Sequence, residues 1–380
     1  MSELRVNTIT DETGGNTATI NGMTPTADSL QGFRNRLINS DMRIDQRNAG
    51  ASVTITNVLA TTFITDRWGV YGSITSKFSA QQNAGAVTPP PGFTNYLGAT
   101  SLSSYSVTSG EFYQISQGIE GFNIADLGWG TANAQSITLG FWVRSSLTGA
   151  FSGAVQNSAF NRSYPFSFTI NAANTWEYKT VTVPGDTSGT WLTNNGLGIS
   201  LVFNLGAGAN NLGTAGAWVG AGRAGVTGSQ SIIGTSGATF YITGVQLEAG
   251  SVATPFERRP YGTELQLAQR YYYRISTSGA TYQSFGLASG YNALQMRLDT
   301  IFPVTMRTAP TSLEASAASS FLYEKEAGYA VSPSAIVLGS QSSAFVGVSV
   351  GTTSSVTAGG AVYHTYSNGT PAYLGFSAEL

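Results

Sequence analysis

Apolar and polar residues alternate along several segments of this chain, which is the pattern of half-buried β-strands. The segment EYKTVTVPG (177–185) alternates cleanly, as an antiparallel strand with one face in a core should. The segment GISLVFNLG (198–206) is almost continuously apolar, which predicts a strand covered on both faces. Two more β-branched and aromatic segments occupy residues 136–147 and 238–248. Because no helical period persists over 33–258, the pattern predicts a jelly-roll or β-sandwich domain there.

Residues 1–32 differ in pattern from the rest of the chain. Leu4, Val6 and Ile9 are spaced nearly as in a strand, and the next residues are turn-forming with little to bury. Such a segment cannot build a core of its own. Two interpretations stay open: a frayed terminus, or an N-terminal arm that attaches to a partner by strand addition through these three side chains.

Residues 259–380 predict a short linking helix followed by a smaller C-terminal β domain. Thr263 and Gln266 have the spacing of a capping box. Apolar residues then recur at i, i+3, i+4 and i+7, the spacing of one helix face. This face comprises Ala268, Tyr271, Tyr272 and Ile275. We expect it to lie in an interdomain or intersubunit seam.

Strands in the C-terminal domain are predicted at 293–302 and 343–351, and an Asn368-Gly369 turn between aromatic residues predicts a hairpin. Four arginines lie near the three consecutive tyrosines, an arrangement that also suits single-stranded nucleic acid. They are Arg258, Arg259, Arg270 and Arg274. A capped helix explains these residues without a ligand, so we expect no nucleic-acid partner.

Composition narrows the class of protein. Charged residues make up only 10% of the 380, yet the chain has 18 Tyr, 19 Phe and 6 Trp, so it is not a disordered chain. So little surface charge predicts a homo-oligomer that hides much of its surface. A net charge of −2 gives no general attraction to nucleic acid or anionic lipid. No apolar run is long enough to span a bilayer and the N-terminus has no signal-peptide pattern, which predicts synthesis in a cytoplasm without membrane insertion.

The chain offers few groups for catalysis. It has no cysteine, and its one histidine, His364, has no neighbouring acid or nucleophile motif, so we expect a structural or surface role for it. We therefore expect no catalytic residues, no metal site, no cofactor and no enzyme. Hydrolysis of glycans by paired carboxylates is the alternative. Its candidate acids are Glu111, Glu120, Asp126, Glu177 and Glu248.

Glycan binding needs exposed aromatic rings with few charges around them. Trp129, Trp191 and Trp218 lie in Gly/Thr/Asn-rich contexts typical of loops, where a ring can face solvent. Trp142 and Trp176 adjoin strand segments and are expected in the core. The alternative is that every tryptophan packs inside.

Several long segments resemble those of virion proteins of tailed phages and prophages, a family of tail-fibre or carbohydrate-binding-like structural proteins. They begin with LINSDMRIDQRNAGASVTI, continue through NAQSITLGFWVRSSL and YPFSFTINAANTWEYKTVTVPG, and end with GATFYITGVQLEAGSVATPFERRPYGTELQLAQRYYYRI. The SELRVNTITDETGG opening is similar to the N-terminal attachment peptides of phage fibre proteins. The resemblance implies a jelly-roll domain like those of sugar-binding modules, an attachment arm, and a trimeric or otherwise symmetric assembly.

We therefore expect a non-enzymatic virion protein: a tail-fibre or adhesin subunit, homotrimeric, attached to other virion proteins by residues 1–32 and binding host-surface glycan. The expected organisation is an arm (1–32), a jelly-roll domain (33–258), and a linking helix with a C-terminal β domain (259–380). A capsid decoration or head-fibre protein is the first alternative, since the resemblance does not distinguish tail from capsid. A glycan-depolymerising tailspike is the second.

Overall fold

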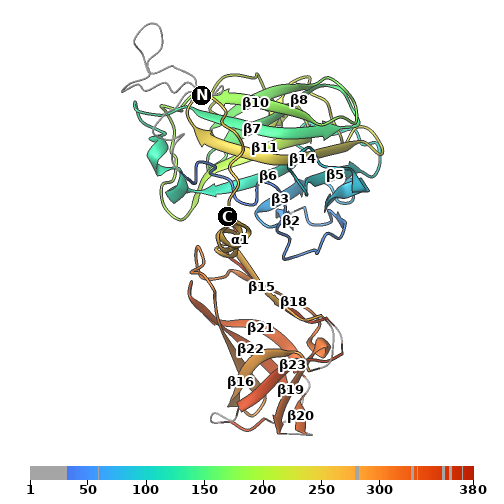
Figure 1. The fold of residues 1–380 in the computed structure, drawn as a ribbon, viewed down its shortest axis with the longest axis vertical. Helices are drawn as coiled ribbons and strands as arrows, with labels where there is room; N and C mark the ends of the chain where they lie inside the picture. The colour runs from blue at the N-terminus through green and yellow to red at the C-terminus, as the bar shows by residue number, and fades with distance from the viewer. Residues whose placement is uncertain are drawn as a thin grey trace, which may run out of the picture. The chain divides into compact units, whose positions relative to one another are not determined.

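The protein divides into two compact units, Met1–Pro260 and Tyr261–Leu380, two residues beyond the boundary expected after residue 258. The computed structural model describes residues 32–58, 60–278, 282–326, 329–331, 333–352, 356–358, 362–369 and 371–380. The expected attachment residues Leu4, Val6 and Ile9 lie outside the described residues. Figure 1 shows that both units are built mainly from β-strands.

The first unit contains two six-stranded antiparallel sheets. The first sheet consists, in spatial order, of β1 (Val53–Thr54), β4 (Phe78–Gln82), β5 (Leu97–Ser101), β14 (Thr239–Ala249), β7 (Ile137–Ser145) and β10 (Glu177–Val183). The second sheet consists of β2 (Thr62–Thr65), β3 (Trp68–Gly72), β6 (Phe112–Glu120), β11 (Leu197–Ala207), β8 (Gly149–Gln156) and β9 (Ser163–Ile170).

The core of the first unit lies between these two sheets. Every second residue of β7 points into it, including Leu139 and Phe141, and the Phe141 ring meets Phe203 of the second sheet at a centroid distance of 5.1 Å. A second contact between the sheets joins Phe151 to Phe240 at 5.7 Å. The expected jelly-roll β-sandwich architecture is thus confirmed, because alternate residues of the facing sheets interdigitate to form one core.

Short elements complete the first unit between the long strands. They are η2 (Ala84–Ala86), η3 (Gly121–Asn123), η4 (Ala125–Leu127), η5 (Ala209–Asn211), and the parallel pair β12 (Leu212–Gly213) and β13 (Gly225–Val226).

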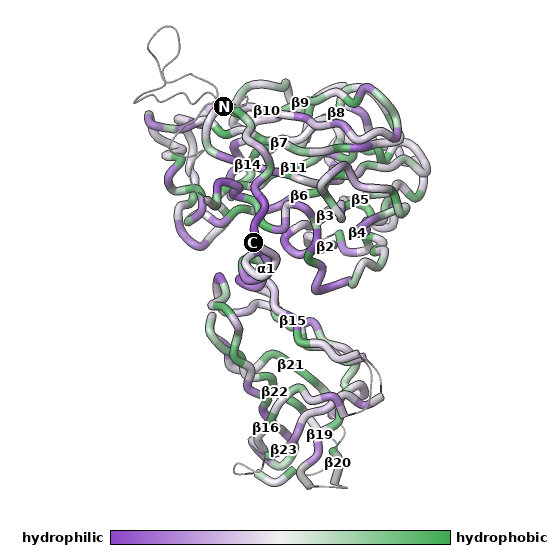
Figure 2. Tube along the Cα trace, in the orientation of Figure 1, coloured by the Kyte–Doolittle hydropathy of each residue, from purple (hydrophilic) through white to green (hydrophobic). Residues whose placement is uncertain are grey.

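The second unit begins with the helix α1 (Tyr261–Gln269) and contains two further sheets. The smaller sheet consists of β15 (Tyr272–Ser276), β24 (Tyr373–Ser377) and β18 (Ser312–Ala315). The larger sheet, in spatial order, consists of β20 (Tyr329–Val331), β19 (Phe321–Glu326), β23 (Val362–Ser367), β16 (Ser284–Asn292), β17 (Gln295–Ile301), β22 (Phe345–Thr352) and β21 (Pro333–Gln341). A single turn, η6 (Ala318–Ser320), precedes β19. Hydrophobic residues occur on strands of both units in Figure 2, in agreement with a separate core in each.

The linking helix is shorter than predicted, and its expected apolar face does not exist. The helix begins at Tyr261, directly after Pro260, so Thr263 lies inside it rather than at its N-cap. Of the four face residues, only Ala268 is helical. Tyr272 and Ile275 belong to strand β15 and Tyr271 lies between the two elements. Residues 272–276 form backbone hydrogen bonds with β24, and this strand pairing outweighs their helical spacing. The pairing could not be predicted from neighbouring residues because β24 lies about 100 residues later in the sequence. Ala268, Tyr271 and Tyr272 are nonetheless fully buried.

Among the residues that the structure describes around Asn368-Gly369, the predicted hairpin is also not formed. The flanking strands β23 and β24 belong to different sheets: β23 pairs with β16 and β19, whereas β24 pairs with β15 and β18. Gly369 does adopt the positive φ of 68° that the turn signal indicated, so the local geometry was right and the strand pairing was wrong. Within the described residues, no helix has the length and apolar character needed to cross a membrane.

Candidate functional site

The three tryptophans predicted as glycan-binding residues form one aromatic cluster. The ring centroids of Trp129, Trp191 and Trp218 lie 4.6 to 5.5 Å apart, each pair edge to face. Trp129 and Trp191 are only 6% and 7% exposed, so neither presents a ring face to solvent and the prediction of two open sugar platforms is wrong. Trp218 is half-buried against the same core.

Polar contacts fix this tryptophan cluster to the loops around it. The indole N–H of Trp191 donates to Asp186, and that of Trp218 donates to the carbonyl of Pro184. The Asp186 carboxylate also accepts two hydrogen bonds from Arg162, at 2.7 and 2.6 Å. These hydrogen bonds raise the pKa of Arg162. The cluster therefore fastens loops at the end of the sandwich, as buried aromatic side chains with satisfied N–H groups do.

An aromatic surface lies instead on the outer side of the first sheet. Trp142 of β7 and Tyr178 of β10 are register partners with ring centroids 5.6 Å apart. Both have the parity opposite to the core residues of their strands, and Tyr178 is 43% exposed. Trp142 and Trp176 are half-buried, so the expectation that both lie in the core is also wrong. We call this surface the aromatic face.

Glycines on neighbouring strands let these rings lie across the sheet. A Cβ atom built on Gly140 of β7 would overlap the hydroxyl of Tyr178, so that ring reaches over the glycine. The Phe93 ring in the same way lies 2.5 Å from the position of a Cβ on Gly244. The same Cβ would lie 3.2 Å from Trp142, which places Phe93 and Trp142 next to each other. The rings thus form a continuous surface.

A loop arginine extends the aromatic face. The Arg258 guanidinium lies 4.8 Å from the centroid of Phe93 and 5.6 Å from that of Phe256, and these two rings are 5.1 Å apart. Arg258 is exposed, so its donors remain accessible to a ligand while its planar group lies against the rings. Figure 1 shows β7, β10 and β14, the strands beneath the face.

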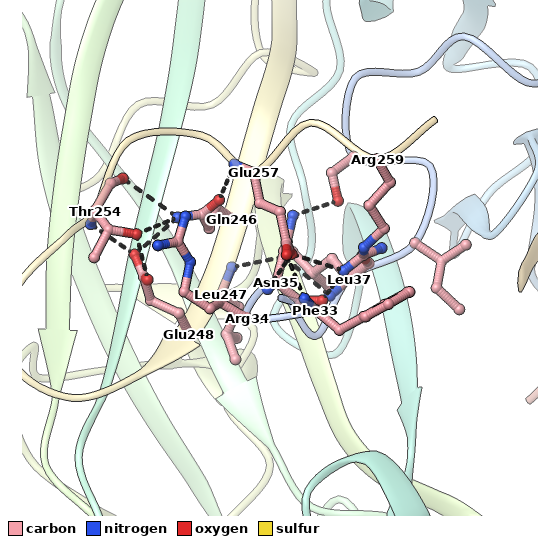
Figure 3. A network of polar contacts seen from close by, with 12 residues as sticks. Phe33, Arg34, Asn35, Leu37, Gln246, Leu247, Glu248, Thr254, Glu257 and Arg259 are labelled. Carbon is pink, nitrogen blue, oxygen red and sulfur yellow. Dashed lines mark hydrogen bonds and ion pairs between the residues drawn. The ribbon is translucent and has the colours of Figure 1, made fainter. Parts of the chain in front are cut away.

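A polar network holds the segment that carries Phe256 and Arg258 (Figure 3). The carboxylate of Glu257 accepts hydrogen bonds from the backbone N–H groups of Phe33 and Asn35, and the Glu257 N–H donates to Gln246 at 2.7 Å. Arg259 donates to the carbonyl of Leu37 at 3.2 Å. Since Glu257 and Arg259 point into this network, the alternate residues Phe256 and Arg258 are directed to the other side, against the aromatic face.

The Glu248 carboxylate is engaged in the same network (Figure 3). It accepts hydrogen bonds from the Thr254 backbone N–H at 2.8 Å, the Thr254 hydroxyl at 2.6 Å and the Gln246 side chain at 2.9 Å. Burial, and secondarily the charge of Glu248, raise the pKa of Tyr178. The phenol therefore remains a neutral hydrogen-bonding group at the rim of the face at any physiological pH.

The other predicted acids are likewise engaged in structural contacts. The carboxylates accept hydrogen bonds in different parts of the first unit: Glu111 from Tyr105 and Thr108, Asp126 from Arg36, Glu177 from Lys179, and Glu248 from Thr254. In the part of the chain that the structure describes, no group of three or more acidic or histidine side chains is placed to hold a metal ion. The aromatic face suits a ligand that packs against ring faces and forms hydrogen bonds with polar side chains around them.

Comparison with known proteins gives only distant similarities. No protein-family profile and no curated protein matches the chain. The enzymatically active domain of a tailspike protein from bacteriophage CBA120 is similar at 12% identity and a TM-score of 0.30. The match covers 58% of this chain but only 22% of that domain's chain.

Two sugar-binding structures show the same level of similarity. One is a putative sugar-binding protein from Bacteroides thetaiotaomicron, with 12% identity, a TM-score of 0.32, and 57% of this chain and 100% of that chain covered. The other is a family 11 carbohydrate-binding module of a Clostridium thermocellum cellulase, with 12% identity, a TM-score of 0.26, and 55% and 100% covered. At such TM-scores these likenesses carry no argument about what this chain binds.

Proposed function

We propose that the chain is a non-enzymatic structural protein of a tailed-phage virion, a tail-fibre or adhesin subunit that binds host-surface glycan through the aromatic face of its first unit. The observation that carries the glycan proposal is the pairing of Trp142 with Tyr178 on the outer side of the sheet, extended by Phe93 over Gly244. The apolar C–H face of a sugar ring packs against aromatic rings, while its hydroxyls bond polar groups at the rim.

The virion part of the proposal is supported by the resemblance of the sequence to phage virion proteins, and by its fit to an all-β chain of low charge. In this proposal residues 1–32 attach the subunit to the particle and the sandwich faces the host surface. Because the arm and the sandwich have different roles in this proposal, attachment and glycan binding can be tested separately.

A glycan array with quantitative titration tests the binding function. We expect the wild-type protein to bind host-surface oligosaccharides. The variants Trp142→Ala and Tyr178→Ala should each weaken binding about ten-fold, because the loss of one ring contact of ~1.4 kcal/mol corresponds to that factor. Phe122→Ala is the matched control, because Phe122 is an aromatic residue of the same unit, 59% exposed and outside the face. Equal affinity of all four proteins, or no binding at millimolar sugar, would contradict the proposal.

A capsid decoration or head-fibre protein is the second candidate. In that role residues 1–32 would attach the subunit to the capsid, and the protein would not need to bind a host receptor. Deleting residues 1–32 distinguishes attachment from binding: the truncated protein should keep its glycan affinity but fail to incorporate into particles. Retained incorporation would remove the arm from the proposal. A tailspike would reduce the viscosity of host polysaccharide, and that result would overturn the non-enzymatic assignment.

A further inference from the structure

Arg258 is an exposed cation held against the aromatic face by contacts that leave its hydrogen-bond donors unused. Its guanidinium lies 4.8 Å from the ring centroid of Phe93 and 5.6 Å from that of Phe256. It also approaches Gly92 so closely that a Cβ built on that glycine would lie 2.8 Å from the Nη2 atom. Two rings and a glycine backbone thus position the planar group without occupying its N–H groups.

The neighbouring arginine shows what a purely structural guanidinium looks like in this segment. Arg259 is buried and donates to the carbonyl of Leu37 at 3.2 Å. Arg258 is exposed, and it makes no hydrogen bond or ion pair with any residue that the structure describes. Its donors therefore face solvent beside aromatic rings, where an incoming acceptor can reach them.

Two carboxylates near the aromatic face, Asp41 and Glu248, already have partners within the protein. Burial raises the pKa of Asp41, and the charges of Arg43 and then Arg258 oppose this rise. The Oδ2 atom of Asp41 forms an ion pair with the Nε atom of Arg43 at 3.2 Å. Glu248 accepts hydrogen bonds from the backbone and the hydroxyl of Thr254. Since neither acid contacts Arg258 directly, a positive charge remains available to a ligand.

A free guanidinium beside ring faces matches a sugar that carries a negative charge. The planar fork of N–H groups fits the paired oxygens of a carboxylate or a phosphate, and hydrogen bonds to a charged group are stronger than those between neutral groups. Phe93 connects the two parts of the face, because its ring lies next to Trp142 on one side and next to Arg258 on the other. One oligosaccharide can therefore contact the rings and the guanidinium together.

We propose that the aromatic face binds an acidic glycan and that Arg258 binds the anionic group of one of its sugars. This inference rests on the proposed glycan-binding function and adds the charge class of the ligand. The chain as a whole, with a net charge of −2, does not attract anions, so the preference depends on this local group.

Titration of the full-length protein with paired acidic and neutral ligands tests the inference. The probes are uronic-acid oligosaccharides with their methyl esters, and phosphorylated oligosaccharides with their dephosphorylated forms. We expect the acidic member of one kind of pair to bind about ten-fold more tightly than its neutral counterpart, and this ratio of affinities to fall as salt is added. The kind of pair that shows the difference identifies the anionic group as a carboxylate or a phosphate.

Substitutions of the exposed Arg258 locate the preference. Arg258→Gln should reduce the ratio of acidic to neutral affinity from about ten to about one. Arg258→Lys keeps the charge without the planar fork and should retain part of the ratio. Arg297→Gln is the matched control, because Arg297 is an arginine of the second unit in a surface ion pair with Asp299, and it should leave the ratio unchanged.

The ratio separates a role in recognition from a role in packing. If Arg258 only supported the rings, Arg258→Gln would weaken both members of a pair equally, and the unchanged ratio would overturn the inference. Equal binding of both members of every pair by the wild-type protein would also overturn it, while glycan binding by the aromatic face would stand. Binding of no member of any pair would contradict the proposed function as well.

Discussion

Gly140 shows how a residue without a side chain determines the shape of the aromatic face. Its hydrogen leaves the space that the Tyr178 ring occupies, and any Cβ there would overlap the phenol oxygen. We predict that Gly140→Ala displaces the Tyr178 ring and lowers glycan affinity about as much as Tyr178→Ala, roughly ten-fold. Titration with the best array ligand measures this effect.

The control for this prediction is Thr180→Ala, the register partner of Gly140 on β10. It alters the same row of the sheet without adding atoms beneath the ring. If the Gly140→Ala and Thr180→Ala variants both bind glycan with the affinity of the wild-type protein, the glycine is not needed to orient Tyr178.

Glu177 links pH to the loop that carries Trp176. Burial alone would raise the pKa of Glu177, but hydrogen bonds from Lys179 and from the N–H groups of Ala172 and Asn171 together lower it. A lowered pKa in the folded state stabilises the protein above the ordinary value of 4.5, and this contribution is lost as the pH falls through the folded-state value.

We therefore predict that Glu177→Gln is less stable than wild type at pH 7 and that the difference shrinks below about pH 4.5. Urea unfolding at pH 7, 5 and 3 measures it. A stability difference that stays constant over this range would mean that the carboxylate charge has no role.

The tryptophans show what residue context can and cannot predict. Loop-like surroundings suggested exposure for Trp129 and Trp191, but loops that converge at one end of a sandwich can build a core together, and no local signal reports that convergence. For Trp142 the signal was present: it shares the parity of Gly140, opposite to that of Leu139 and Phe141 in the core. Strict alternation along the strand would have placed it outside.

At the scale of elements, strands with a clear period were predicted well. The alternating segment became β10 and the continuously apolar one became β11, which is buried along nearly its whole length. The YYYR segment misled because its apolar spacing fits a helix, although the same residues also alternate. In β15, Tyr273 and Ile275 pack on the core of the second unit, while Arg274 lies on the opposite side over the Tyr373 ring at 3.7 Å.

This alternation gives a prediction for β15. Tyr273→Ala should lower the free energy of unfolding of the second unit by about 3 kcal/mol, since it leaves a cavity beside Phe302. Arg274→Ala, on the adjacent outward position, should cost about 1 kcal/mol or less. Chemical denaturation followed by circular dichroism distinguishes them, and equal costs would contradict the strand assignment.

At the scale of the whole molecule, the first unit is closed by contacts between residues more than 200 positions apart in sequence. We predict that Glu257→Ala lowers its stability by about 3 kcal/mol, because Arg259 would remain buried without its acid and two backbone N–H groups would lose their acceptor. Asp126→Ala is the control: its partner Arg36 is also an arginine, but Asp126 is half-exposed, so the loss should stay under about 1 kcal/mol. Thermal unfolding measures both, and similar losses would contradict the special role of Glu257.

The position of that closure has a mechanical consequence. The segment that begins at Phe33 and the segment from Glu257 to Arg259 are bonded to each other, although they are more than 200 residues apart in sequence. Tension applied between these two segments is therefore carried first by the few hydrogen bonds that join them, before it reaches the long strands of the two six-stranded sheets. A subunit pulled at its ends would keep its aromatic face intact until those bonds yield.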